Sequence, residues 1–507
     1  MPRIERVLSI TLAKPYRTKD LRNEDEDATP CTNEQGHLAF APHDIENPKN
    51  WSTTRRWFIT FSGILTVLNA TFASSSVSGC LPSISSSLHV STEAAGLTIT
   101  VFLLANSFGP LFWAPLSEFY GRRWIFYGTF LGYLAFNLLC AWAPNFGALL
   151  VGRFLTRLFS SSTQANVPGL LADIWEPNQR SVALMFFAVS VLVGPALGPV
   201  VAGFLELKKD WRWTMYVLLW AAAGTLPFLF TIPETLPDQI LFRGLQAPAE
   251  ASNRSLRHIF KVTLTRPWKI FFDPIASVCC VYQALVYALL YMLFSIYPIV
   301  FHDMRGWNVG VSELPLLGTM IGAFVGGAIN YYFIRRDRER RASGADIRPE
   351  DRLTVAKIGG IMFPVSMFWF SWTANYNSIH WIVPTLAGVF LSASFLLIFV
   401  GYLNYLVDNY LSYAASALAA NTVLRTFCGA AAPLFTTYMF RSLTVAGGGS
   451  LIAGLACLLA VIPFVFSKYG EQIRKRSKYI ETDQQRAPDG KDSTVENDPS
   501  SKAQNHV

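Results

Sequence analysis

Residues 58–88 read FITFSGILTVLNATFASSSVSGCLPSISSSL, without a single Asp, Glu, Lys or Arg. A helix needs about 20 apolar residues to cross a bilayer, so this stretch predicts one transmembrane span and part of an outer loop. The same test predicts further spans near residues 95–116, 124–142, 148–172, 182–204, 213–232, 275–301, 313–334, 356–374, 381–404, 413–439 and 446–467. The polar stretch 233–272 separates the first six spans from the last six.

The composition agrees with a chain that lies mostly in lipid. Of the 507 residues, 51% are hydrophobic and 15% are charged, whereas soluble domains average roughly 25% charged residues. The sequence therefore predicts an all-α integral membrane protein with twelve transmembrane helices in two six-helix halves. The expected order is a disordered tail (1–56), the first half (57–232), a central loop (233–272), the second half (273–467) and a second disordered tail (468–507).

The distribution of Lys and Arg predicts the orientation. These residues are most frequent around residues 122–123, in the central loop 233–272 and in the loop 335–352. Cytoplasmic loops of membrane proteins are rich in Lys and Arg, so we expect these loops and both termini to be cytoplasmic. The same rule accounts for the net charge of +8, and no basic patch on a soluble domain indicates a nucleic acid partner.

The sequence contains no pattern typical of an enzyme or a metal centre. Two of the seven cysteines, Cys279 and Cys280, are adjacent, which does not match the separated cysteine pairs of a zinc site. There is no phosphate-binding loop that would indicate transport driven by ATP. We expect neither enzymatic activity nor a cofactor.

A charged loop follows the second predicted span. Residues 114–123 read APLSEFYGRR, so that Glu118 precedes Gly121, Arg122 and Arg123. Glycine permits a tight turn, and the arginines could then form an ion pair with Glu118 or with a neighbouring helix end. The simpler interpretation is an ordinary basic cytoplasmic loop.

Two arginines lie inside the fourth predicted span. Arg153 and Arg157 are four residues apart and therefore share one helix face. A charge in a bilayer is costly unless it faces a partner or a wet cavity, which indicates a functional role for Arg153. Like charges at this spacing repel, so Arg157 suggests an acidic substrate. The alternative is that Arg157 reaches the membrane surface or pairs with a loop carboxylate.

The fifth predicted span carries closely spaced small residues. It reads GPALGPVVAG over residues 194–203, with Gly194, Gly198, Pro199 and Gly203. Small residues allow neighbouring helices to approach closely, and proline allows a helix to bend. Such spacing alone is common in membrane helices.

Taken in order, these motifs resemble those of the major facilitator superfamily. Residues 114–123 resemble its signature loop, although the family usually has Asp where Glu118 stands, and residues 335–341 look like a degenerate second copy. Gly152-Arg153 resembles the intramembrane arginine motif, with Arg157 replacing the usual Gly. Residues 194–203 resemble the motif that exporters of the superfamily carry and importers generally lack.

Further motifs are similar to those of the fungal twelve-span drug/proton antiporters, a branch that contains polyamine, fluconazole and mycotoxin exporters. They are Pro233-Glu-Thr, Arg266-Pro, the stretch 349–353, His380-Trp-Ile, the stretches 404–410 and 416–425, Tyr469-Gly470 and Arg474. The resemblance covers about residues 47–480. It implies two helical halves that rock around a central cavity and a proton gradient as the driving force.

The resemblance implies that polar residues, chiefly of the first and fourth helix of each six-helix half, line the cavity. The candidates are Asn69, Asn106, Arg157, Gln164, Tyr282, Gln283, Tyr287, Tyr291, Asn421 and Arg425. For each, helix packing is the alternative role. The first span has no acid, so proton coupling is expected to use Asp173 or Glu118 with Arg153, and the sequence does not choose between them.

The sequence predicts a monomeric exporter of small amphipathic molecules, in the plasma membrane or alternatively the vacuolar membrane. A proton-coupled importer or facilitator is the first alternative, and the direction of flux distinguishes it. A membrane sensor that transports nothing and a membrane-embedded enzyme are the others.

Overall fold

The computed structural model describes residues 31–32, 38–40, 44, 46–244, 256–344, 348–410, 413–474 and 477. Within this part the fold is helical apart from one antiparallel pair of two-residue strands, β1 (Cys31–Thr32) and β2 (Leu38–Ala39). The two tails predicted to be disordered lie largely outside the described residues.

The first half begins with a capped short helix and continues as long helices. The order is η2 (Pro48–Asn50), α2 (Thr53–Ser75), η3 (Ser76–Cys80), α3 (Leu81–Leu88), α4 (Thr92–Tyr120), α5 (Arg122–Ala141), α6 (Phe146–Ile174), α7 (Pro177–Glu206) and α8 (Arg212–Phe230). Several helix starts have a side-chain cap. Ser91 accepts a hydrogen bond from the Ala94 N–H at 3.1 Å, and Asn145 accepts one from Ala148 at 2.8 Å, which satisfies donors that the helix leaves unpaired.

The rest of the chain contains two shorter helices and the helices of the second half. They are α9 (Pro237–Gly244), α10 (Leu256–Phe271), α11 (Pro274–Tyr297), the π-helical turn η5 (Pro298–Met304), α12 (Val309–Glu313), α13 (Leu316–Ala342), η6 (Pro349–Arg352), α14 (Leu353–Ala374), α15 (Ile382–Asn409), α16 (Ala414–Ala460) and α17 (Ile462–Arg474). Inside α16, Thr444 has φ 63° and ψ 169°. The helix therefore breaks there into two arms.

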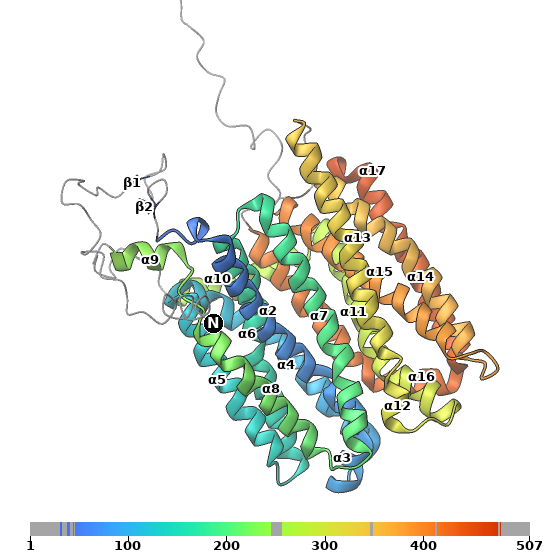
Figure 1. Ribbon diagram of the computed structural model, residues 1–507. Coiled ribbons are helices and arrows are strands. Elements are labelled where there is room, and N and C mark those ends of the chain that lie inside the picture. The colour runs from blue at the N-terminus through green and yellow to red at the C-terminus, as the bar shows by residue number, and fades with distance from the viewer. Residues whose placement is uncertain are drawn as a thin grey trace, which may run out of the picture.

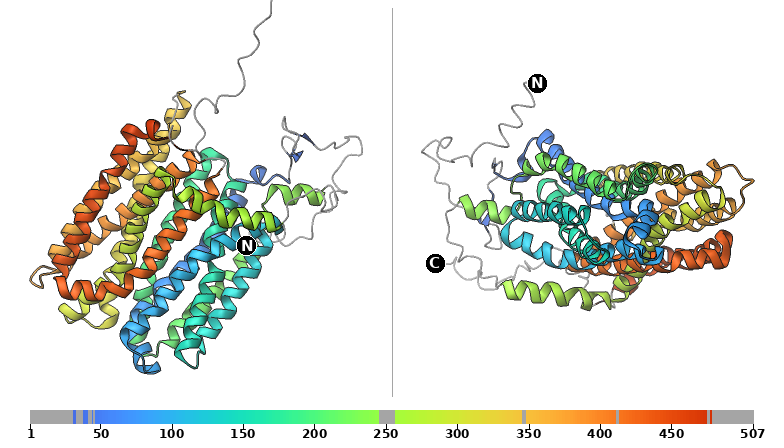
Figure 2. Two further views of the ribbon diagram at one scale, coloured as in Figure 1. Left: turned by 180° about the vertical axis from the view of Figure 1, so that it is seen from behind. Right: turned by 90° about the horizontal axis from the view of Figure 1, so that it is seen from below.

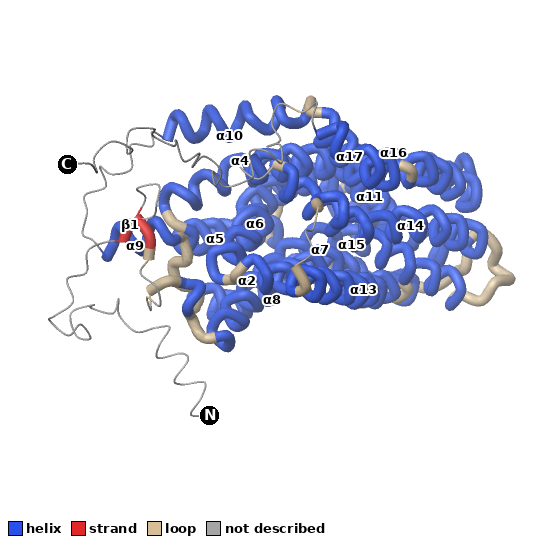
Figure 3. The backbone as a smooth tube through the Cα atoms, turned by 90° about the horizontal axis from the view of Figure 1, so that it is seen from above, coloured by secondary structure: helices blue, strands red, loops and turns tan. Residues whose placement is uncertain are grey.

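The long helices form two groups (Figure 1). Helices α2, α4, α5, α6 and α8 lie on one side, and α11 and α13 to α17 lie on the other. The groups meet where α7 packs against α13 and where α4 packs against α16. Helix α10 runs along the outside of the bundle, as the end-on view in Figure 2 and the tube in Figure 3 show, and it contacts α4 and α16.

Within the described residues, ten helical segments are long and apolar enough to cross a membrane. Helix α6 is not one of these segments, since Arg153 and Arg157 lower its hydropathy. The segment Ala414–Arg474 counts as one, although its helix breaks at Thr444. Twelve spans would require α6 and both arms of α16 to be counted separately. The count of twelve and the cytoplasmic position of both termini stay predictions.

The outer surface of the bundle is apolar. Trp142 and Trp220 are each 61% exposed, and Leu458 is 72% exposed. Soluble monomers rarely expose large contiguous apolar patches, whereas lipid chains solvate such side chains. The chain is therefore a multi-pass membrane protein.

Candidate transport site

At one end of the first half, acidic side chains from two other segments hold the start of α5. Gly121 joins α4 to α5 with a φ of 92°, which glycine adopts without strain. Arg122 Nε lies 2.5 Å from a carboxylate oxygen of Asp173, near the end of α6. The Thr235 hydroxyl donates to the same carboxylate at 3.3 Å, and Glu234 accepts the backbone N–H of Arg122 at 3.0 Å. We call Arg122, Asp173, Glu234 and Thr235 the first latch.

Of the two partners expected for the arginines, the neighbouring helix end is the one that Arg122 reaches. Glu118 is exposed and forms none of the contacts of the first latch. Arg123 donates its backbone N–H to Glu234 at 3.2 Å and its Nε to the Tyr127 hydroxyl at 3.2 Å. The turn at Gly121 thus presents two consecutive N–H groups to one carboxylate.

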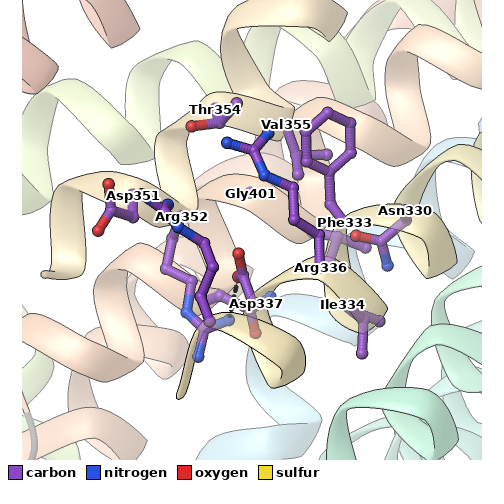
Figure 4. Close-up of a pocket in the computed structure, with 13 residues that line it drawn as sticks. Asn330, Phe333, Ile334, Arg336, Asp337, Asp351, Arg352, Thr354, Val355 and Gly401 are labelled. Carbon is purple, nitrogen blue, oxygen red and sulfur yellow. Dashed lines mark hydrogen bonds and ion pairs between the residues drawn. The ribbon is translucent and has the colours of Figure 1, made fainter. Parts of the chain in front are cut away.

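The second half has a matching arrangement (Figure 4). Arg352, directly before α14, donates its Nε to Asp408 at 2.9 Å and its Nη1 to Asp337 at 3.2 Å. We call Arg352, Asp337 and Asp408 the second latch. Beside it, Glu350 lies 3.1 Å from Arg474. In both halves an arginine at the start of the third long helix pairs with an aspartate near the end of the fourth. A pocket that is lined in part by Asn330, Arg336 and Asp351 opens beside Arg352.

Only one residue of the predicted second copy, residues 335–341, joins the second latch. That residue is Asp337. Arg335 and Glu339 pair with each other at 3.0 Å, with side chains 71% and 66% exposed. Such exposed pairs contribute little to stability.

Arg153 lies wholly inside the protein. Its side chain is 0% exposed, its Nη2 donates to the Ala73 carbonyl at 3.0 Å, and its guanidinium lies 4.0 Å from the ring centroid of Phe102. The Ala73 carbonyl of α2, the Thr98 carbonyl of α4 and an aromatic face therefore stabilise the cation.

Arg157 is buried in the same way, one turn further along α6. It is 0% exposed and donates to the Ala70 carbonyl at 3.0 Å and to Gln164 Oε1 at 2.7 Å. Its alternative roles were to reach the surface or to pair with a loop carboxylate; it is buried, and it pairs with no loop carboxylate among the described residues. Among the described residues, no carboxylate forms an ion pair with Arg153 or Arg157.

The small residues of α7 lie at close contacts with both halves. A Cβ at Gly198 would lie 2.7 Å from the Ser76 backbone nitrogen, and one at Gly194 would collide with α2. A Cβ at Gly203 would lie 3.0 Å from the Val309 carbonyl oxygen. Helix α7 therefore packs by its backbone against η3 of its own half and against α12 of the other half.

A pocket lies between α7 and the second half. It encloses about 410 Å³ of empty space when open solvent is included, and its lining comprises Val191, Leu192, Gln283, Val286, Tyr287, Leu290, Phe395, Ile398, Phe399 and Arg425. Gln283 donates to the Phe399 carbonyl at 3.2 Å and accepts a hydrogen bond from Asn421. The structure thus brings four of the predicted cavity residues together: Gln283, Tyr287, Asn421 and Arg425.

Two other predicted cavity residues lie elsewhere. Asn69 donates to the Thr225 hydroxyl at 2.9 Å and accepts from the Tyr133 hydroxyl at 3.1 Å, both within the first half. Tyr282 packs edge-on against Tyr402, with ring centroids 5.3 Å apart. Both residues therefore contribute to packing between helices of one half.

Asn106 and Glu313 are two of the buried polar side chains whose atoms lack a hydrogen-bond partner among the described residues. Asn106 on α4 is 0% exposed and both its amide atoms are unpaired. Glu313 at the end of α12 is 1% exposed and its Oε2 is unpaired. Its Cγ would lie 3.1 Å from a Cβ at Gly203. The sequence did not single out Glu313 because it stands at the predicted start of a span, where an acid normally meets water.

No group of His, Cys, Asp and Glu that could hold a metal ion occurs in the part of the chain that the structure describes.

Comparisons with known proteins agree with this arrangement. The Major Facilitator Superfamily family model matches residues 63–433. The chain is 37% identical to "Efflux pump FUB11" of Gibberella moniliformis, over 94% of this chain and 83% of the relative. It is 39% identical to "Major facilitator superfamily multidrug transporter mdrA" of Aspergillus fumigatus, over 87% and 75%.

A solved structure shows the same fold. The proton:xylose symporter XylE is 17% identical and superposes with a TM-score of 0.62, covering 83% of this chain and 96% of that one. The family match and the fungal relatives together show that this chain belongs to the major facilitator superfamily and is a membrane transporter, not an enzyme.

Proposed function

We propose that the chain is a proton-coupled antiporter that exports small amphipathic molecules, with the pocket beside Tyr287 and Arg425 as part of its substrate cavity. The proposal includes twelve spans, both termini in the cytoplasm and a monomer in the plasma membrane. The proton gradient supplies the free energy, and no cofactor is required.

The observation that carries the proposal is the position of the α7 glycines. Gly198 packs on η3 of the first half, while Gly203 packs on α12 of the second. Helix α7 can therefore close one end of the cavity without side chains in between. The latches lie at the opposite end of the bundle from this closed contact. Because the proposal places the latches on the cytoplasmic side, the closed contact lies on the outer side of the membrane.

Export is favoured over import because relatives that align over most of this chain are named efflux pumps and multidrug transporters. The sequence of α7 also resembles the motif of exporters.

Glu313 is our choice for the carboxyl that takes up the outer proton. It lies at the closed outer contact, and an ionised carboxylate buried without a partner is strongly destabilising. The closed contact is therefore compatible with the neutral acid. Opening the contact would let water reach Glu313, and a proton taken up from outside would then permit closure.

No charged group compensates Glu313 in the closed contact. Apart from Arg180 near the opposite end of α7, the titratable residues on the elements packed around it are Glu206 on α7, Cys80 in η3, and His302 and Asp303 in η5. None of them forms a hydrogen bond or an ion pair with Glu313 in the described part of the chain. Neutralisation by a proton is the remaining way to bury this carboxyl.

The experiment is retention of a panel of drugs, toxins, polyamines and organic acids in yeast that lacks its own exporters. We expect lower retention of at least one compound, reversed by a protonophore. Glu313→Gln should still exchange labelled for unlabelled substrate, yet lose the acceleration of export by low outer pH. Glu93→Gln, an exposed acid on α4, is the matched control.

Two results would overturn the proposal. Higher accumulation of the compound in expressing cells would replace export by the importer alternative. An unchanged pH profile in Glu313→Gln would move the proton site elsewhere, for which Asp173 would be the next choice. A fluorescent fusion distinguishes plasma from vacuolar membrane in the same cells.

A further inference from the structure

Three arginines are buried inside the bundle without a carboxylate. Arg153 and Arg157 are 0% exposed, and Arg425 on α16 is 8% exposed. None of the ion pairs among the described residues includes any of them. Guanidinium groups stay charged in proteins, so this region carries several buried positive charges without a compensating anion. Buried charges are ordinarily paired.

Arg425 is the least satisfied of the three. Its Nε and Nη1 are buried and have no hydrogen-bond partner among the described residues. Its guanidinium lies 4.9 Å from the ring centroid of Phe399 and 5.3 Å from that of Tyr287. The aromatic rings orient the planar group, while its N–H donors remain available. The side chain lines the pocket between α7 and the second half.

Arg157 reaches the same region from the other half. Arg157 donates to the Ala70 carbonyl on α2, four residues before Ser74. The hydroxyls of Tyr287 and Tyr291 lie 3.5 Å apart, and that of Tyr291 lies 3.1 Å from the Ser74 hydroxyl on α2. A ligand beside these tyrosines would therefore contact groups from both halves.

The remaining walls of the pocket are apolar. Val286, Leu290, Phe395 and Ile398 surround the donors of Arg425. A bare inorganic anion would leave these walls uncovered. A molecule with an anionic group at one end and an apolar body at the other satisfies both parts of the surface.

We propose that the substrate is an amphipathic organic anion, a carboxylate attached to an aromatic or aliphatic body, whose carboxylate binds Arg425 between Phe399 and Tyr287. Arg157 adds a second positive charge from the opposite half. Charge-assisted and bidentate hydrogen bonds between guanidinium and carboxylate supply the specificity. This inference deepens the proposed function and rests on the pocket being part of the transport cavity.

The test measures binding to the purified full chain in lipid nanodiscs by calorimetry. The probes are two matched pairs, 1-naphthoate with 1-naphthamide and 4-butylbenzoate with 4-butylbenzamide. Each pair shares its apolar body and differs in charge. We expect the acid to bind at least about tenfold more tightly than the amide, because hydrogen bonds to a charged group are the stronger ones. Equal binding within both pairs, or no binding of either acid, would overturn the proposal.

Variants locate the site. Arg425→Gln is expected to weaken acid binding by roughly ten- to hundredfold, the range of a lost charged hydrogen-bond pair, and to leave amide binding within about threefold. Arg425→Lys should recover part of the affinity, since it restores the charge without the planar fork. Arg441→Gln, on the same helix and 69% exposed, is the matched control. Retained acid binding in folded Arg425→Gln would place the anion elsewhere.

Flux assays separate this inference from the proposed function. Acids that bind through Arg425 but do not move against their gradient would leave the anion site standing and contradict proton-coupled export. Export of the amides alone, driven by the proton gradient, would support proton-coupled export and contradict the anion site.

Discussion

Replacing Asp173 by Asn should destabilise the protein far more than any change in an exposed ion pair. Arg122 and Asp173 are 11% and 12% exposed and lie 2.5 Å apart. Removing one partner leaves the other charge buried, which costs about 3–5 kcal/mol in comparable buried pairs. Because both groups keep slight access to water and Arg122 also anchors α5 through its backbone, we expect a loss of about 3 kcal/mol.

A double-mutant cycle separates the pair from other effects of the substitutions. Unfolding in mixed micelles with increasing dodecyl sulfate would be followed for Arg122→Gln, Asp173→Asn and the double variant. The double variant removes both charges, so its loss in free energy of unfolding should be about 2 kcal/mol smaller than the sum of the losses in the two single variants. Arg335→Gln should change stability by about 0.5 kcal/mol or less, since its pair with Glu339 is exposed. Additive losses within about 0.5 kcal/mol would refute the ion pair as the stabilising contact.

The other predictions concern the second latch and the glycines of α7. Arg352→Gln should cost roughly 1–2 kcal/mol, less than the loss at Asp173, because Asp408 is 34% exposed; an equal or larger loss in the same unfolding assay would contradict this ranking. Gly198→Val should abolish transport while the protein still inserts, since its Cβ would lie 2.7 Å from the Ser76 backbone nitrogen. Gly224→Val should leave transport unchanged, because a Cβ there meets nothing within 4 Å; similar export by the two glycine variants would refute close packing of α7.

Long apolar segments were the most predictable part of the fold. The same test of apolar length predicted a span at residues 148–172, where the structure has α6, although this helix is not apolar enough to count as a span by hydropathy. The predicted gap between residues 439 and 446 contains Thr444, the one residue at which the backbone of α16 departs from helical geometry. A change of backbone direction at one residue leaves little trace in composition.

The partners of charged residues were less predictable. Glu118 precedes Arg122 by four residues, yet the side chain of Arg122 reaches Asp173 on another helix. Which helix ends meet depends on packing, which the sequence of one loop does not contain. For the same reason Asp337 was visible only as part of a basic stretch, and its pairing with Arg352 across the loop was not.

Helical periodicity explains which of the candidate cavity residues lie together. Tyr287 and Tyr291 are four apart and lie together, with ring centroids at 5.2 Å. Tyr282 precedes Tyr287 by five residues, which turns it to a different face of α11, where it packs on Tyr402. The sequence did not indicate the burial of Glu313, because this burial arises from the approach of α7. The motif around Gly203 predicted a close helix contact but not which residues it would contact.

The most direct test of the central claim is transport in proteoliposomes that contain a pH-sensitive dye and labelled 1-naphthoate, with an acidic outer buffer. Protein-free liposomes measure passive leakage of the acid. We predict that label leaves faster than in these controls while the lumen acidifies in step with it, and that Arg425→Gln abolishes both signals. Label and protons moving in the same direction, or label leaving at the passive rate, would contradict proton-coupled export.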